Sequence, residues 1–517
     1  MAYCSPTLVL AAALFAFARG GPALAQPTDT NPCGAIGVTQ VQPKAILPTY
    51  FSAASKNQIA ADCFAWQEFI YLNWKADRND PGTPDSNTQW SSFGMPGDTS
   101  ATVWESFLSA TQAFTQSAAR AKSAWQDRRP STRTLFNVSK LGDAVLDNIG
   151  QAGNGKWISD QRGVPAFYEI LLNEDEYAYI TTNVFDDSDL TTFAGQRACA
   201  SQQGQNGRGG FNLPAGNAQG NTDVDCKGNV TTYGQGVGAI EIKAAWVALP
   251  SDGSLNYRYK TALAEYTLPG GKPVQATMGL VGLHIIHKVP GANQFVWATF
   301  EQIDNDPDDN NGNPVAPTLP RNPNQKPSPG YTFFNPNCNP QTDIYYRCKP
   351  NTPPGDACPI GKPPTPDCIP YSAPMQITRI TPVDSQANSV TDYAWSILPA
   401  DSVFNYYRLI DVQWPNSPQP VPPQSTVPLS TGDITPSSAS HIVANTTLET
   451  YLQTQKSCMD CHQSARIGNP SQQITAQLAG RRVRRVLVAP PKGWTGATDN
   501  PDYASDYSFV FTVETNR

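Results

Sequence analysis

Two cysteines and a histidine near the end of the chain have the spacing of a haem-attachment site. Cys458, Cys461 and His462 form the pattern C-x-x-C-H. Two thiols three positions apart can each add to one vinyl group of a haem, and the following histidine can bind the iron as its proximal ligand. The pattern therefore predicts one covalent haem c, held by Cys458 and Cys461, with His462 on the iron.

Paired cysteines have other uses, which the surrounding sequence does not favour. A bare C-x-x-C can be a redox dithiol, a disulfide or half of a zinc site. The histidine directly after the second cysteine favours haem. A zinc site would need two more ligands at matching spacing, but the chain has only four histidines and no second C-x-x-C.

The N-terminus predicts export. Residues 8–18 form an apolar run that is too short to span a bilayer, and Ala23, Leu24 and Ala25 then give an A-x-A cleavage site. We therefore expect residues 1–25 to be a signal peptide cleaved near Ala25, which makes the mature protein periplasmic or secreted. An uncleaved anchor or a buried helix is the alternative. No later segment is long and apolar enough to cross a membrane, so we expect no transmembrane segment in the mature chain.

The other cysteines of the mature chain form an even set of eight, which in an oxidising compartment predicts disulfides. Proximity along the chain suggests the pairs Cys33–Cys63 and Cys199–Cys226. The last four recur every ten residues in a Pro-rich stretch and should pair among themselves: Cys338, Cys348, Cys358 and Cys368.

The pattern of apolar residues predicts an α+β fold with a β-rich core, N-terminal helices and a C-terminal haem-bearing helix. Helices are expected over 63–74 and 103–114, and a hairpin over 278–289 and 294–303 with its turn at Pro290 and Gly291. Thr446 and Glu449 form a capping box, which should begin a helix running towards the C-x-x-C-H motif.

These elements divide the mature chain into four predicted regions after the signal peptide. They are a helical N-terminal region (26–150), a β-rich region (151–305), a Pro-rich, disulfide-stapled insertion (306–375) and a haem c-binding region (376–517) packed on the β-rich core.

The second axial position of the haem iron has few candidate ligands. None of the 55 residues after His462 is Met or His, so a ligand must come from upstream or the iron is five-coordinate. His284 and His287 lie three apart on one predicted strand and should face opposite ways. Among the side chains we favour His284 as the distal candidate, and a hydrogen-bonded core histidine, which is the commoner role, is the alternative. The alternatives are an open or water-bound position and three other side chains: His441, Met278 and Met375.

Charged residues suggest further hypotheses. The net charge of −7 gives no reason to expect nucleic acid as a partner. Residues 481–485 contain four arginines, which could hold haem propionates, face solvent or dock an acidic redox partner. The acidic run from Asp304 to Gly312 resembles a calcium loop but lacks the EF-hand register, so a solvated turn is the alternative. Glu301 should lie near His284 if the hairpin forms, which would suit proton-coupled chemistry.

Four segments carry a resemblance to a known family. They are AWQEFIYLNW (65–74), GLHIIHK (282–288), VWATFEQIDN (296–305) and NTTLETYLQTQKSCMDCH (445–462). In these segments the chain resembles exported bacterial cytochrome c family proteins. The resemblance implies haem attachment at Cys458 and Cys461 and axial ligation by His462, and it implies no particular substrate.

These observations predict a periplasmic monohaem c-type cytochrome with a redox or electron-transfer role and a redox partner protein. The alternative is a haem-dependent oxidase or peroxidase acting on a small molecule, and a third hypothesis is a sensor of a small gas. About 490 mature residues are more than one haem needs for electron transfer, so the surplus implies a cavity, a docking surface or a partner.

Overall fold

The computed structural model describes most of the chain after residue 30. The described residues are 31–52, 57–115, 125–126, 133–135, 156–202, 210–268, 271–341, 348–358, 365, 368–415, 434–435, 442–455, 457–462, 465, 467, 503 and 505–512. The predicted signal peptide, His441 and residues 481–485 lie outside them, so the hypotheses about them remain predictions. All elements below belong to the compact unit Pro32–Arg517.

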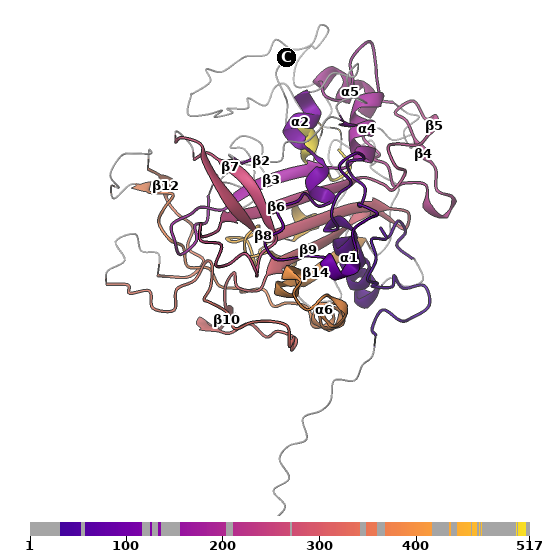
Figure 1. Ribbon diagram of the computed structural model, residues 1–517. Helices are drawn as coiled ribbons and strands as arrows, with labels where there is room; N and C mark the ends of the chain where they lie inside the picture. Colours follow the sequence, from indigo (N-terminus) through magenta and orange to yellow (C-terminus); the bar gives the residue numbers. More distant parts are fainter. Residues whose placement is uncertain are drawn as a thin grey trace, which may run out of the picture. The chain divides into compact units, whose positions relative to one another are not determined.

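A curled nine-stranded sheet is the centre of the described fold (Figure 1). The long strand β8 (Val274–Val289) pairs with β6 along one edge, and its other edge is shared by β7 and β9. The main strand order is β1-β3-β6-β8-β9-β14-β15, and β2 pairs with β7. The other strands of this sheet are β1 (Leu108–Ser109), β2 (Arg133–Leu135), β3 (Phe167–Leu172), β6 (Ile240–Ala248), β7 (Thr261–Tyr266), β9 (Ala292–Gln302), β14 (Tyr407–Pro415) and β15 (Ile434–Thr435).

The predicted hairpin is confirmed. β8 and β9 are antiparallel, and the two-residue turn at Pro290 and Gly291 joins them. Gly291 has φ +91°, a conformation that side chains disfavour. Most residues of the hairpin are buried, since both faces of the sheet are covered, and this explains the near-continuous apolar runs in its sequence.

Two helices cover one face of the sheet beside β9 and β14 (Figure 1). Asn57 caps α1 (Gln58–Leu72) by accepting a hydrogen bond from the Ala60 amide, and the helix is buried almost all round. The ring of Phe300 on β9 lies 5.2 Å from that of Trp66 and 4.4 Å from that of Phe69. The indole of Trp66 also donates to Thr391 of α6 (Ser385–Ile397), so helices and sheet form one core.

The remaining elements are short. Among the described residues the helices are α2 (Ala110–Thr115), α4 (Glu174–Thr182), α5 (Phe193–Ala200) and α7 (Cys458–His462). Three two-stranded sheets pair β4 (Asp223–Val224) with β5 (Val230–Thr231), β10 (Asp308–Asn310) with β11 (Asn313–Val315) and β12 (Asp356–Ala357) with β13 (Cys368–Ile369). The 3₁₀ turns are η2 (Trp90–Ser92), η3 (Trp104–Ser106), η5 (Ala218–Gly220), η6 (Val403–Tyr406) and η8 (Val510–Thr512). No helix among the described residues is long and apolar enough to cross a membrane.

The predicted fold class, α+β with N-terminal helices and a C-terminal haem-bearing helix, is wrong. The structure is β-rich with few, short helices, and residues 446–455 form turns. The motif itself occupies only the five-residue helical turn α7. Glu449, the expected capping residue, accepts a hydrogen bond from the amide of Asn445, while Asn445 is tied to the sheet. A local hydrogen bond to Glu449 and the tertiary contacts of Asn445 therefore use groups that would have begun the helix.

The second N-terminal helix, expected over 103–114, is also replaced by shorter pieces. Trp104 lies in the 3₁₀ turn η3, and Leu108 and Ser109 pair with β3 as an edge strand. Only α2 follows. Pairing with the sheet has outweighed the local helical pattern here.

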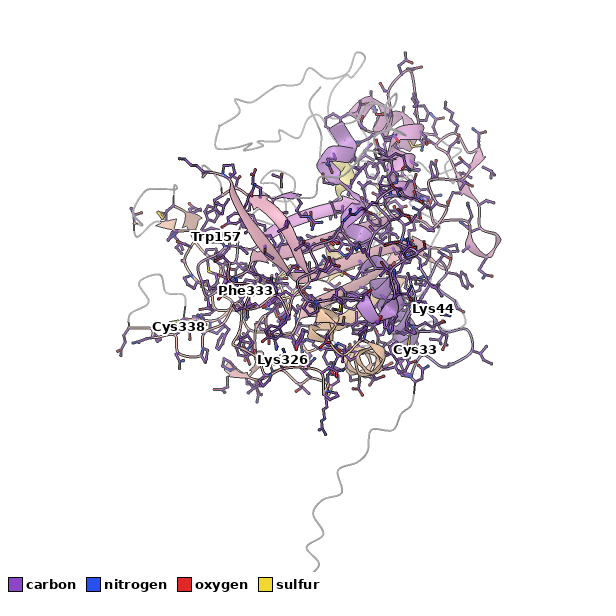
Figure 2. All side chains as sticks on the ribbon, viewed as in Figure 1. Cys33, Lys44, Trp157, Lys326, Phe333 and Cys338 are labelled. Carbon is purple, nitrogen blue, oxygen red and sulfur yellow. A yellow bond between two sulfur atoms is a disulfide. The ribbon has the colours of Figure 1, made fainter. Side chains whose placement is uncertain are left out.

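The predicted disulfides are confirmed. Cys33 pairs with Cys63, and Cys199 with Cys226. The last four cysteines pair among themselves, as Cys338–Cys348 and Cys358–Cys368. Figure 2 labels Cys33 and Lys44 on the N-terminal segment, which is tied to α1 by the Cys33–Cys63 disulfide and by the Gln67 amide, which donates to the carbonyl of Lys44.

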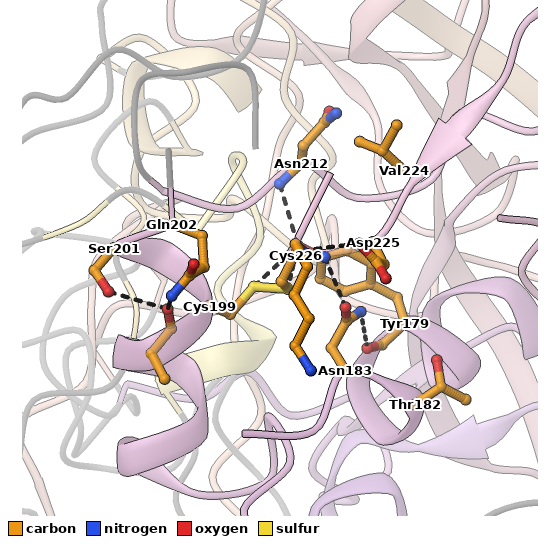
Figure 3. Close-up of a disulfide and its surroundings, with 12 residues drawn as sticks. Tyr179, Thr182, Asn183, Cys199, Ser201, Gln202, Asn212, Val224, Asp225 and Cys226 are labelled. Atoms are coloured by element: carbon orange, nitrogen blue, oxygen red, sulfur yellow. Dashed lines mark hydrogen bonds between the residues drawn. A yellow bond between two sulfur atoms is a disulfide. The ribbon is translucent and has the colours of Figure 1, made fainter. Parts of the chain in front are cut away.

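The Cys199–Cys226 bond lies in a buried polar setting that ties α5 to the loop after β4 (Figure 3). The amide of Cys226 donates to Asn183, and the hydroxyl of Tyr179 lies 3.7 Å from the sulfur of Cys199. Neither cysteine is exposed.

We expect a Cys199→Ala/Cys226→Ala variant to lose about 3 kcal/mol of unfolding free energy, because its loop of 27 residues becomes unrestrained in the unfolded state. The Cys338→Ala/Cys348→Ala variant should lose less, since that loop spans 10 residues and both cysteines are partly exposed. Denaturant titrations of the two variants measure this difference. An equal or reversed order would contradict it.

Candidate haem c site

The sheet face opposite α1 and α6 receives the C-x-x-C-H motif. Side chains alternate along a strand, so His284 and Ile286 of β8 share a face with Trp297 and Thr299 of β9, their direct cross-strand partners. His462 lies on this face, with its ring centroid 4.4 Å from that of Trp297. The ring of Phe509 lies 4.9 Å from His462, so the imidazole is packed between two aromatic groups from distant parts of the chain.

One hydrogen bond fixes the chemical form of His462. Its Nδ1 lies 2.7 Å from the backbone carbonyl of Tyr507. A carbonyl can only accept, so Nδ1 carries the hydrogen and donates it. Burial lowers the pKa of His462 to about 3, although the Tyr507 carbonyl opposes that shift. The ring is therefore neutral at pH 7, with the lone pair on Nε2.

This arrangement fits an iron ligand. A metal-binding histidine usually donates its other ring nitrogen to a carbonyl or carboxylate, which sets the tautomer and the orientation of the ring. The Nε2 of His462 makes no hydrogen bond to any residue that the structure describes. Cys458 opens α7 and is partly exposed, whereas the side chain of Cys461 lies outside the described part of the chain.

A short segment, Asn445 to Glu449, attaches the approach to the motif to the same sheet face. We call it the anchor segment. The Asn445 side chain donates to Thr299 and to the carbonyl of Phe300, at 2.9 Å each. Tyr168 of β3 donates to the carbonyl of Thr447. The backbone can come this close because residue 282 is glycine: a Cβ there would lie 2.1 Å from Thr447 Oγ1.

The two histidines of β8 face opposite sides of the sheet, as predicted. His287 is fully buried beneath α1, where its Nδ1 lies 2.5 Å from Glu68. His284 faces the motif side, with its Nε2 3.1 Å and 3.2 Å from the two carboxylate oxygens of Glu449. Charges on His284 and Glu449 both influence the pKa of His462. The ligand role of His284 therefore stays a prediction, and its Nε2 already has a partner.

Other sequence candidates have different surroundings. Met278 and Met375 are buried in apolar clusters. Figure 2 labels Trp157 and Phe333, which belong to the same cluster as Met375. Met459, inside the motif, is buried, and its amide donates to Gln413 of β14.

The hairpin alone suggested that Glu301 would lie near His284, but the two side chains do not pair. Its carboxylate is bonded to Arg379 and accepts from the Thr446 amide at 2.5 Å. The carboxylate beside His284 is Glu449, whose sequence context indicates only a capping residue. Tyr507 and Phe509 were likewise not identified, because no local pattern reveals a contact made across 45 residues.

The acidic run after β9 is held by arginine. Asp304 makes a bidentate ion pair with Arg258, with Nε–Oδ2 at 2.5 Å and Nη2–Oδ1 at 2.8 Å. Both side chains are buried, so the two carboxylate oxygens of Asp304 are occupied by arginine rather than available to a calcium ion. Within the described residues, no group of three or more His, Cys, Asp or Glu side chains could hold a metal ion.

No protein-family model matches the chain, and neither a curated protein nor a solved structure is significantly similar to it.

Proposed function

We propose that this chain is an exported monohaem c-type cytochrome with a redox role, of the kind that exported bacterial cytochrome c family proteins represent. Cys458 and Cys461 would hold the haem covalently, and His462 would be its proximal ligand. The observation that carries the proposal is the hydrogen bond from Nδ1 of His462 to the Tyr507 carbonyl, which directs the lone pair to Nε2. The four disulfides suit the periplasm or the extracellular space, after cleavage near Ala25.

When bound, haem c supplies an iron that changes its oxidation state by one electron. The chain's own residues would tune that change. The Tyr507 carbonyl orients the imidazole of His462 and increases its basicity. Trp297 and Phe509 pack against the ring, and an apolar surrounding is one of the means by which proteins set a haem potential. A redox partner protein would exchange the electron.

A haem-dependent oxidase or peroxidase with a small-molecule substrate is the second candidate. The pairing of His284 with Glu449 favours it, because a carboxylate that accepts from an imidazole prepares the ring for proton transfer. The same pair would also orient His284 as a distal ligand through Nδ1, which favours electron transfer.

Absorption spectra of the ferric and ferrous protein, with and without carbon monoxide, distinguish the two candidates. Electron transfer predicts a low-spin spectrum that carbon monoxide does not change, because two protein ligands occupy the iron. In that case His284→Ala should convert the spectrum to high-spin and allow carbon monoxide to bind, whereas Glu301→Gln should leave it unchanged. A wild-type spectrum that shifts with carbon monoxide would favour the enzyme, and absence of any haem spectrum would contradict both.

A further inference from the structure

Two buried glutamates face each other beside the candidate site with no donor between them. Glu176 of α4 and Glu241 of β6 are 0% and 5% exposed. Both oxygens of Glu176 and one of Glu241 have no hydrogen-bond donor, and the side chains contact each other. Two ionised carboxylates in contact repel strongly in a buried setting. The pair is therefore more stable when one carboxyl carries a proton and donates it to the other than when both are ionised.

The local fold explains how Glu176 comes to this position. Asn173 follows directly after β3 and caps α4, accepting from the amide of Glu176. A glutamate at this position of a helix usually reaches back to the amide of the capping residue. Here that amide donates instead to the carbonyl of Ile240 on β6. Glu176 is left to face Glu241, the next residue of that strand.

The charged groups around the pair do not neutralise it. Asp506 lies near both glutamates and adds negative charge, but it is itself paired with Lys288, with Nζ–Oδ2 at 2.5 Å. Lys243, two residues along β6, favours the ionised form of Glu241. Burial remains the largest influence and raises the pKa of Glu241 to about 7, and the pKa of Glu176 is raised well above its ordinary value.

Three consecutive residues join this pair to the proposed iron ligand. The Asp506 side chain holds Lys288, the Tyr507 carbonyl accepts from His462, and the Ser508 hydroxyl donates to Glu241. Across the sheet, Glu241 pairs with Ile286, which pairs with Trp297 under His462. Two strand spacings separate Glu241 from Trp297, about 10 Å. At that range, within a protein interior, a change of charge beside Trp297 changes the proton affinity of Glu241.

We propose that Glu176 and Glu241 form a site that binds one exchangeable proton and couples it to the oxidation state of the haem iron. This inference rests on the proposed function. When the ferric iron accepts one electron from a one-electron reductant, the site loses a positive charge, and the pair takes up one proton from water. Oxidation returns the electron to an acceptor and the proton to water. The electron and the proton therefore balance in each direction.

The first test is the midpoint potential of the haem-loaded protein as a function of pH. Since the reduced form binds the proton more tightly, the midpoint potential should fall as pH rises through neutrality. The largest slope is a tenfold change in the redox equilibrium constant per pH unit, which is about 59 mV for a one-electron couple. Glu176→Gln and Glu241→Gln should each flatten this dependence. Glu169→Gln is the matched control, because Glu169 is a partly buried strand carboxylate that has Arg133 opposite it at 2.9 Å, and it should keep the wild-type slope.

A second readout does not depend on electron transfer to a partner. The infrared difference spectrum between reduced and oxidised protein should contain the band of a protonated carboxylic acid, and both glutamine variants should lack it. The inference would be overturned by a haem-loaded wild type whose potential does not depend on pH, or by glutamine variants that keep the slope and the band. Either result would leave the proposed function unaffected. A chain that never carries haem would contradict the proposed function as well, so the two failures are distinguishable.

The shared proton also predicts a pH dependence of stability. The folded pair holds a proton between the ordinary glutamate pKa of 4.5 and the raised pKa of about 7, whereas the unfolded chain has released it. The folded state then binds more protons, so the free energy of unfolding should fall as pH rises through this window. Glu176→Gln should remove this part of the fall. Thermal unfolding of both proteins from pH 5 to 8 measures it, and parallel curves would count against the shared proton.

Discussion

A Cys458→Ala/Cys461→Ala variant is expected to carry no haem that survives denaturation. Each thioether bond needs one of these thiols, and the remaining cysteines of the mature chain are paired in disulfides. The expected change is complete loss of the covalent signal, because no other cysteine pair in the sequence has a histidine directly after it. Haem staining of a denaturing gel, with the variant and wild type expressed alongside the haem-attachment machinery, measures this.

Two comparisons make this experiment specific. Each single variant, Cys458→Ala or Cys461→Ala, keeps one thiol and should retain part of the signal. The Cys338→Ala/Cys348→Ala variant removes two cysteines from the Pro-rich stretch and should retain all of it. Equal loss in this control would mean that the staining reports folding or export rather than attachment, and full staining of the first variant would rule out these thiols.

The second large effect is expected at Gly282, where the anchor segment lies against the sheet. A Gly282→Ala substitution places a methyl group 2.1 Å from Thr447 Oγ1 and 2.9 Å from the Asn445 side-chain oxygen. Either the strand or the anchor segment must move, at a cost of about 2 kcal/mol in unfolding free energy. Displacement of the segment also moves Glu449 away from His284, so we expect reduced haem occupancy. Denaturant unfolding and the ratio of haem to protein absorbance measure the two effects.

A second substitution tests the cause. Thr447→Ala removes the nearest clashing atom, so the Gly282→Ala/Thr447→Ala double variant should be more stable than the sum of the two single changes predicts. Additive losses would mean that the glycine is needed for some other reason, such as the flexibility of β8.

The sequence predicted those parts of the fold that depend on local pattern. The hairpin of β8 and β9 follows from two β-type runs around Pro290 and Gly291, and proximity along the chain was enough for the disulfides Cys33–Cys63 and Cys199–Cys226. The helix expected after Thr446 fails because its capping groups are used in contacts with strands more than 140 residues away. A single sequence contains no signal for such contacts.

The candidate site also has a part that the sequence predicted and a part that it did not. The C-x-x-C-H motif is contiguous and so can be recognised directly, whereas its supporting groups come from β9 and from the C-terminal residues Tyr507 and Phe509. The opposite orientations of His284 and His287 follow from strand alternation alone. The partners of these histidines, Glu449 and Glu68, do not, and neither does the contact of Glu176 with Glu241 across 65 residues.

The intact mass of the purified, denatured wild-type chain tests the central claim most directly. We expect the mass of the polypeptide without residues 1–25 plus one haem, together with a haem absorption spectrum in the same sample before denaturation. The added mass should disappear in the Cys458→Ala/Cys461→Ala variant. A wild-type mass equal to that of the polypeptide alone, from cells in which a known c-type cytochrome receives its haem, would contradict the proposal that this protein is a c-type cytochrome.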